Sequence, residues 1–352
     1  MGKLAFFTDS HFGVRGSNAY FDDIMMEFFS RQFFPECKKN SVTDIICLGD
    51  FTDNRKQINF RTLHTIKYSF LPLLEEYGIT LHIFDGNHDI FYKHTNEISS
   101  MMVLADDPNV VVYKEPTEVV FGDTKFLFVP WLNDNNFEPF YKVIEKSDAD
   151  VCLGHFEFSG ALLYKNSISV CGLSPSLFKH FKKVYVGHYH HRNKLDNIQY
   201  IGATGYYTWQ DYNDYRGMML LDTSTLDETY IENKHSLFKE VIYEDELFDS
   251  LVDTINTLEN RVVKIIVKSK ENLVNYESYI QKLYKMNIIN FTLLDETRSI
   301  TTYKDDNSKE IVELEDVSDK PIVEMIKAEL ETEEEFKEIE SIFNEALLAE
   351  DL

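Results

Sequence analysis

Five short motifs rich in aspartate and histidine lie in the first 190 residues, each at or just after the end of a predicted strand. In chain order they read D-S-H at 9–11, G-D-F-T-D at 49–53, G-N-H-D at 86–89, G-H at 154–155 and G-H-Y-H at 187–190. One such motif alone arises by chance in many chains. The five together are informative, because α/β sheets place functional side chains at the carboxyl ends of their strands.

The residue types in these motifs indicate a metal centre. Carboxylates and imidazoles together suit manganese, iron or zinc, and the absence of thiolates disfavours a purely soft site. Two metals ~3.5–4 Å apart can clamp the attacking and leaving oxygens of a phosphoryl displacement and generate hydroxide at neutral pH. Such a pair needs one bridging carboxylate and ligands on both flanks. Glycine before Asp50, Asn87, His155 and His188 would allow a tight turn off each strand end.

This motif set resembles the signature of the calcineurin-like metallophosphoesterases. Within that superfamily the chain resembles the SbcD-type DNA repair nucleases, which include the recombination endonuclease subunits of T-even-like phages. Supporting stretches are G-H-F-E-F-S-G at 154–160 and D-Y-R-G at 214–217. The protein-phosphatase branch expects G-D-x-x-D-R-G, whereas Asn54, Arg55 and Lys56 follow Asp53 here.

The resemblance implies two divalent metals, with manganese preferred, and seven ligands. They are Asp9, His11 and His190 for one metal, Asn87, His155 and His188 for the other, and Asp50 as the bridge between both. Three further residues have implied roles near the substrate. His88 would act on the scissile phosphate, Asp89 would orient His88, and Asp53 would either support a ligand or position the substrate.

The elements that position these motifs read as an α/β fold. Apolar runs predict strands at 3–8, 44–48, 80–85, 110–113, 125–129, 150–154, 183–187, 199–202 and 217–222. Helices are predicted at 20–38, 60–77, 97–104 and 139–146. Early strands separated by helices favour parallel pairing, and the later, closely spaced strands suggest a second, more antiparallel sheet. The resemblance adds a four-layer α/β/β/α sandwich over residues 1–243.

The pattern changes after residue 243. A helix at 246–258, a strand at 262–268, a helix at 273–285 and a strand at 288–294 predict a small α/β capping domain over 244–298. Residues 299–320 read as a polar linker. Two amphipathic segments then fill 321–352. The resemblance implies that they bind an SbcC-type ABC ATPase; alternatively, they pack against their own catalytic domain.

Composition limits the classes of function. The 352 residues carry a net charge of −25, which weighs against a lone duplex-DNA binder and means that a nuclease would need metals or a partner to offset repulsion. Residues 301–352 hold 5 Lys against 18 Asp and Glu, a net charge of −13. No apolar run approaches the ~20 residues of a membrane span, and no signal peptide is recognisable. We therefore expect a cytoplasmic chain with no membrane association.

The resulting hypothesis is a manganese-dependent nuclease of DNA recombination and repair. The resemblance implies 3′-to-5′ exonuclease activity on duplex ends, endonuclease activity on single strands, and a homodimer formed through the catalytic domain. Two alternatives remain. A small-substrate metallophosphatase or phosphodiesterase is disfavoured by the extra domain and the acidic C-terminal region, and a binding subunit without metals is disfavoured by the complete ligand set.

Overall fold

A computed structural model of the chain describes residues 2–164 and 167–297. The predicted linker at 299–320 and the predicted amphipathic segments at 321–352 lie outside the described residues. Among those described, no helix is both long and apolar enough to cross a lipid bilayer.

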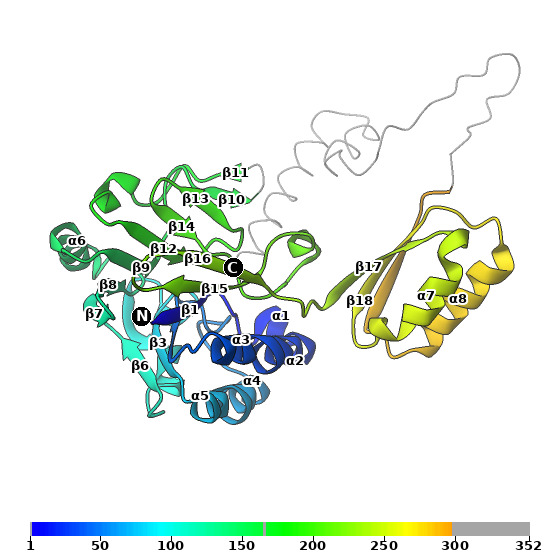
Figure 1. Cartoon of the computed structure of the whole chain (residues 1–352), viewed down its shortest axis with the longest axis horizontal. Coiled ribbons are helices and arrows are strands. Elements are labelled where there is room, and N and C mark those ends of the chain that lie inside the picture. The colour runs from blue at the N-terminus through cyan, green and yellow to red at the C-terminus, as the bar shows by residue number, and fades with distance from the viewer. Residues whose placement is uncertain (1, 165–166, 298–352) are drawn as a thin grey trace, which may run out of the picture.

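The first of two central sheets has six strands (Figure 1). Across the sheet they are β16 (Glu228–Glu232), β15 (Gly217–Asp222), β1 (Lys3–Phe7), β2 (Asp44–Cys47), β3 (Thr80–Phe84) and β6 (Val110–Tyr113). The four strands from β1 to β6 run parallel, as predicted, and β15 and β16 add antiparallel pairs at one edge.

The second sheet also has six strands. They are β13 (Asn193–Leu195), β14 (Ile198–Tyr200), β12 (Lys183–Gly187), β9 (Val151–His155), β8 (Thr124–Val129) and β7 (Thr117–Phe121). The prediction of a more antiparallel sheet was wrong, because the four central strands are parallel and only the two edge pairs are antiparallel. The connections from β8 to β9 and from β9 to β12 are long enough to cross back over the sheet and start again at the same end, whereas β12 reaches β14 through the edge strand β13.

Helices cover the outer face of the first sheet. They are α1 (Val14–Ser17), α2 (Ala19–Phe28), α3 (Phe34–Lys39), α4 (Phe60–Thr65) and α5 (Leu71–Tyr77). The π-helical segments η1 (Phe29–Phe33) and η2 (Ile66–Phe70) join them into the two long helices that the sequence predicted. A buried aromatic cluster that includes Phe7, Phe29 and Phe70 fills this interface, with ring centroids 4.9–6.4 Å apart.

The outer face of the second sheet packs against α6 (Phe137–Lys146) and the 3₁₀ turn η4 (Pro175–Phe178). A separate apolar core, which includes Phe6, Ile46 and Leu153, lies between the two sheets. The order is therefore helices, sheet, sheet, helix, which confirms the four-layer prediction.

A three-stranded parallel sheet forms the smaller unit. It contains β17 (Phe238–Tyr243), β18 (Val262–Val267) and β19 (Asn290–Asp295). One face of it is covered by η6 (Asp245–Leu247), α7 (Phe248–Thr254), η7 (Ile255–Leu258) and α8 (Leu273–Lys285) (Figure 1). Since β17 pairs with β18 along its whole length, the unit begins before Phe238, and the predicted boundary after residue 243 separates β17 from its own sheet.

The helix predicted at 97–104 does not form. Instead β4 (Ile90–Tyr92) and β5 (Thr95–Ser99) make a hairpin, and a single 3₁₀ turn, η3 (Ser100–Val103), follows. The Ser99 side chain accepts a hydrogen bond from the amide of Met101 and so begins that turn after the strand. Three short elements complete the fold, namely β10 (Leu162–Tyr164), β11 (Ser167–Ile168) and η5 (Trp209–Asp211).

Candidate metal centre

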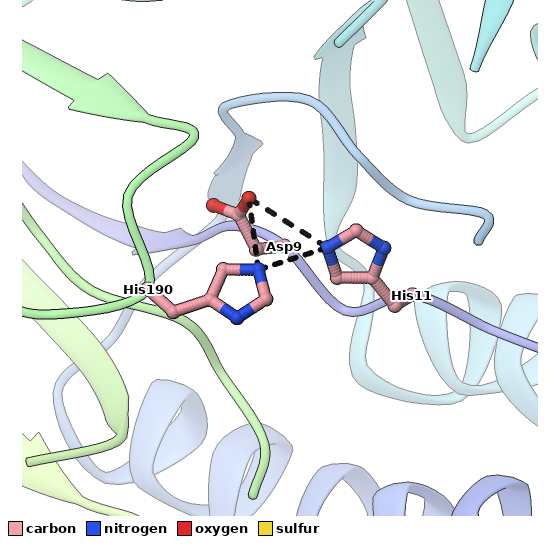
Figure 2. A group of neighbouring side chains, drawn as sticks. All are labelled: Asp9, His11 and His190. Carbon is pink, nitrogen blue, oxygen red and sulfur yellow. Dashed lines mark hydrogen bonds and ion pairs between the residues drawn. The ribbon is translucent and has the colours of Figure 1, made fainter. Parts of the chain in front are cut away.

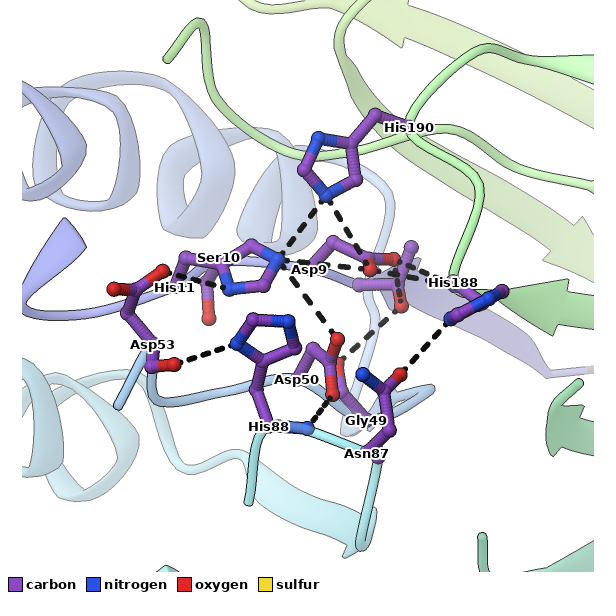
Figure 3. A network of polar contacts seen from close by, with 12 residues as sticks. Asp9, Ser10, His11, Gly49, Asp50, Asp53, Asn87, His88, His188 and His190 are labelled. Carbon is purple, nitrogen blue, oxygen red and sulfur yellow. Dashed lines mark hydrogen bonds and ion pairs between the residues drawn. The ribbon is translucent and has the colours of Figure 1, made fainter. Parts of the chain in front are cut away.

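The five motifs meet at one edge of the sandwich. They follow the carboxyl ends of β1, β2 and β3 in the first sheet and of β9 and β12 in the second. Figure 3 shows side chains from both sheets pointing into one space. The structure thus brings together all seven residues that the sequence analysis assigned as metal ligands.

The first group consists of Asp9, His11 and His190 (Figure 2). The Nε2 atoms of His11 and His190 lie 3.1 Å apart. Each of these nitrogens is 3.8 Å from Oδ1 of Asp9. Asp9 is fully buried and His11 is 4% exposed, whereas the His190 side chain is 36% exposed, so the point between these donor atoms is open to solvent on the side of His190.

The second group contains Asn87, His155 and His188. The Asn87 amide oxygen lies 3.1 Å from Nε2 of His155 and 2.9 Å from Nδ1 of His188. The other ring nitrogen of His155 bonds to the carbonyl oxygen of Leu48 at 2.8 Å. That bond makes Nδ1 the donor and leaves Nε2 of a neutral His155 as the acceptor that could bind a metal.

Asp50 lies between the two groups. Its Oδ2 atom is 3.2 Å from Nε2 of His155 and 3.9 Å from Nε2 of His11. Its other oxygen, Oδ1, accepts a hydrogen bond from the backbone amide of His88 at 2.8 Å. The carboxylate is therefore held in a position from which it could contact a metal on either side.

The pKa values of the four histidines proposed as ligands are shifted in opposite directions. Burial alone would lower the pKa of His11 and of His155, but the nearby carboxylates, including Asp50 and Asp9, outweigh burial and raise both values to about 9. Burial and the charge of His155 lower the pKa of His188 to about 3. Burial and the charge of His11 likewise hold the pKa of His190 well below its usual range.

The donor set fits divalent metals. Oxygen and imidazole nitrogen donors without thiolates are typical of manganese, iron and zinc sites. Each group offers three or more donors around one point, and facing ring nitrogens such as those of His11 and His190 need a proton or a cation between them. Burying carboxylates at this density is costly unless positive charge compensates them.

His88 and Asp53 lie beside the first group. The Nδ1 atom of His88 bonds to the backbone carbonyl oxygen of Asp53 at 2.6 Å. The Asp53 carboxylate oxygen is 3.3 Å from Nδ1 of His11. Of the two roles left open for Asp53, this geometry favours support of a ligand, because a carboxylate on the outer nitrogen of a histidine orients the ring.

Asp89 contacts the backbone rather than the His88 ring, contrary to the expected role. Its buried carboxylate accepts hydrogen bonds from the amides of Gly86, Phe51 and Thr52 at 2.9–3.3 Å. Asp89 therefore joins the loop that carries Asp50 to the loop that carries Asn87 and His88.

The loops after β2 and β3 approach each other so closely that Gly49 and Gly86 leave no room for a side chain. A Cβ atom on Gly86 would lie 2.1 Å from Oδ1 of Asp50, and one on Gly49 would lie 2.8 Å from Nδ1 of His155. Gly49 also has a φ of +94°. Four proposed ligands have positive φ themselves, which stores backbone strain at the site; they are Asp9, His11, Asp50 and His188.

Two aromatic residues that the sequence analysis did not single out border the site. The Trp131 ring lies 5.8 Å from the His155 ring and 5.6 Å from the His188 ring. The Tyr207 ring lies 5.6 Å from the rings of both His11 and His190. Neither belongs to a polar motif, and only the position of Trp131 directly after the buried strand β8 and Pro130 could have indicated it.

The fold and this site are those of a phosphoesterase. The family model for calcineurin-like phosphoesterase matches residues 2–214, more than half of the chain, and the protein belongs to that family. The family prediction is confirmed, and the family uses divalent metals.

A particular relative extends this comparison. The chain is 33% identical over 284 residues to Exonuclease subunit 1 of Enterobacteria phage T4, a match that covers 80% of this chain and 81% of the relative. Among solved structures, GAP50, the anchor in the inner membrane complex of Plasmodium, aligns with a TM-score of 0.37 at 12% identity over 67% of this chain and 90% of its own. A cold-active protein tyrosine phosphatase aligns with a TM-score of 0.32 at 13% identity over 65% and 76%.

The contact between Gly86 and Asp50 gives a first prediction. Gly86→Ala should displace the Asp50 carboxylate and lower manganese affinity by ~10–100-fold, the size of effect seen when groups supporting metal ligands are changed. Gly78→Ala is the control, because no atom lies within 4 Å of the Cβ position of Gly78; its φ of +64° makes alanine strained there without any contact to the site. The control should lose stability without losing affinity. Calorimetric titration measures the manganese affinity, and thermal melting in the presence of a chelator measures the stability of the metal-free protein. Equal affinities in the two variants would contradict the role assigned to the Gly86–Asp50 contact.

The raised pKa values give a second prediction. At pH 7 the metal-free protein should hold protons on His11 and His155, because their pKa of about 9 lies above that pH. Metal binding requires neutral imidazole, so filling both groups should release about two protons. Affinity should therefore increase as pH rises from 6 to 8. Calorimetric titration of metal in buffers of different ionisation enthalpy counts the released protons, and metal saturated with chelator serves as the blank. A metal affinity that falls as pH rises would refute the protonated state of His11 and His155.

Proposed function

We propose that the chain is a two-metal DNA phosphodiesterase that works as 3′-to-5′ exonuclease on duplex ends and as endonuclease on single strands. The observation that carries the proposal is the pair of histidine-containing groups with Asp50 between them. The match to a T4 protein named as an exonuclease subunit supports DNA as the substrate. Manganese is the proposed metal, and the cytoplasm the proposed location, which is that of the host cell if the chain is phage-encoded.

In this proposal the seven ligands hold two metals at the edge where the sheets meet. When bound, the metals would lower the pKa of water and offset negative charge on the phosphate. His88 is the residue placed to act on the substrate itself. Its Nδ1 donates to the Asp53 carbonyl, so its Nε2, when protonated, can donate to a phosphate oxygen or to the leaving oxygen.

The surrounding residues keep that geometry fixed. Asp53 holds His88 through its carbonyl oxygen and lies against His11 through its carboxylate. Asp89 holds the two loops that carry Asp50 and His88. Orientation of this kind removes much of the entropic part of the barrier, because the reacting groups need not be assembled from solution.

A test of the function uses the whole chain on end-labelled duplex and circular single-stranded DNA with manganese or magnesium. The proposal requires metal-dependent release of nucleotides from duplex ends and opening of the circle. A small aryl phosphate monoester serves as the alternative substrate. Hydrolysis of that ester without cleavage of DNA would instead favour a small-substrate phosphatase.

The position of His88 gives the third prediction. His88→Ala should retain two metals and lose cleavage rate by ~10²–10⁴-fold, the usual contribution of a general acid or base. Asp50→Asn is the matched comparison, because it removes charge shared by both groups and should lower metal content and cleavage together. Metal analysis and cleavage rates on the same preparations distinguish them. Loss of metal from His88→Ala in proportion to its rate would make His88 a ligand.

Partners form the remaining part of the proposal. The T4 relative is named as a subunit, which supports a complex, and the proposed partner is an SbcC-type ABC ATPase bound by residues 321–352. A homodimer through the catalytic domain is also proposed. Phe60 in α4 and Tyr68 in η2, 89% and 72% exposed, are apolar side chains available to such an interface.

Truncation before Pro321 gives the fourth prediction. The shortened protein should keep its melting temperature and its metal-dependent cleavage of short single strands, since all five motifs remain. It should fail to bind the ATPase. Phe336→Glu combined with Phe343→Glu should act alike, because burial of an unpaired carboxylate is unfavourable. A truncated protein that melts lower yet still binds the ATPase would show that this segment belongs to the catalytic domain.

A further inference from the structure

The segment between β14 and β15 contacts every member of the first metal group through Tyr207. The Tyr207 hydroxyl donates to the backbone carbonyl oxygen of Asp9 at 2.6 Å. Its ring lies 5.6 Å from those of His11 and His190. Tyr207 is 5% exposed, so its position depends on the groups that hold its own backbone.

Asp211 holds the backbone of Tyr207. One oxygen of its carboxylate accepts hydrogen bonds from the amides of Tyr207 and Thr208 at 2.7 and 2.8 Å. Its other oxygen accepts from Nη2 of Arg216 at 2.5 Å. The Asp211 side chain therefore connects Tyr207 to a buried guanidinium.

Asp214 forms a second connection on the opposite side of that guanidinium. It accepts from Nη1 of Arg216 at 2.8 Å and from Nδ1 of His191 at 2.9 Å. His191 follows the proposed ligand His190 directly in the chain. The Asp214 side chain thus connects Arg216 to the loop that carries His190.

Arg216 joins both connections. It is 1% exposed, and its guanidinium lies between the carboxylates of Asp211 and Asp214. A planar guanidinium can hold two carboxylates in fixed directions, which a lysine ammonium cannot. Removing one partner from a buried ionic group leaves the others uncompensated, so the loops on both sides would have to rearrange.

We infer that Arg216 is a positioning residue that sets the metal affinity of the Asp9, His11 and His190 group, although it touches neither metal nor substrate. This inference rests on the proposed two-metal function. Its consequence is selective, because the two Arg216 connections end at Tyr207 and at the loop of His190, both against the first group, whereas His155 and the His188 ring are held by Leu48 and Asn87. Only one of two bound metals should respond to its loss.

The test counts manganese bound by the full chain as a function of free manganese, using electron paramagnetic resonance. Arg216→Met should weaken one of the two sites by ~10–100-fold, as expected for loss of a group that supports ligands, and leave the other unchanged. The control is Lys183→Met, which breaks the Lys183–Glu228 ion pair at the end of β12 that lies away from the site. The control should keep both affinities.

Further variants distinguish a selective loss of metal affinity from general misfolding. Asp214→Asn breaks only the connection to His191 and should weaken the same single site to a smaller extent, while Asn87→Ala should weaken the other site. The combination Arg216→Met with Asn87→Ala should then bind neither metal tightly. Equal weakening of both sites in Arg216→Met, or none in any Arg216 or Asp214 variant, would overturn the inference. A wild-type protein that binds no pair of metals would overturn the proposed function itself.

Discussion

Burial of three carboxylates within one cluster of loops is the constraint on which the site depends. Asp9, Asp50 and Asp89 are each no more than 2% exposed, and like charges this close in a low-dielectric interior repel strongly. The structure compensates them with directed donors. Asp89 accepts from three backbone amides, and Asp50 and Asp9 accept from the amides of His88 and His188. The same hydrogen bonds that stabilise the charges therefore also fix the loops.

This compensation links the two metal groups. The amide of His188, a proposed ligand of the second group, donates to Asp9 of the first. His155 of the second group lies 4.0 Å from Asp9. The two groups therefore share negative charge at Asp50 and at Asp9, although separate contacts hold the rings and loops of each group. The positive φ angles at Asp9 and Asp50 are tolerated because the strands below them are buried in a four-layer core.

Much of the site could be predicted from the sequence, because the proposed ligands occur in short motifs of fixed spacing that directly follow predicted strands. The motifs that begin at Asp9, Gly49 and Gly86 each start two residues after an observed strand end. The roles of Asp53 and Asp89 were less accessible. Both are polar residues within motifs, and only the path of the loops decides whether a carboxylate reaches a ring or a backbone amide.

The strand directions in the second sheet and the contacts of Tyr207 and Arg216 could not be predicted, since they depend on packing between segments that are distant in the sequence. The direction of the central strands in the second sheet follows from crossovers that lack a long helix, such as the one between β9 and β12. Tyr207 and Arg216 act across about 200 residues of sequence, and no local pattern marks the hydroxyl that meets the carbonyl of Asp9. Arg216 lies in the D-Y-R-G stretch that supported the family resemblance, but its burial between the carboxylates of Asp211 and Asp214 could not be predicted from that stretch.

The net charge of −25 determines how such a site could bind DNA. Affinity for a phosphate backbone comes mainly from cations that replace its counterions, and an acidic surface cannot provide them generally. In this protein the strongest positive charge near a scissile phosphate would come from metals held by the two groups, with His88 beside them. Binding of the scissile phosphate and its cleavage would then depend on the same metal ions. Contacts with more distant phosphates would come from local basic side chains or from a partner. A site built in this way depends on its metals to hold a phosphate, because the net charge of the chain opposes DNA elsewhere.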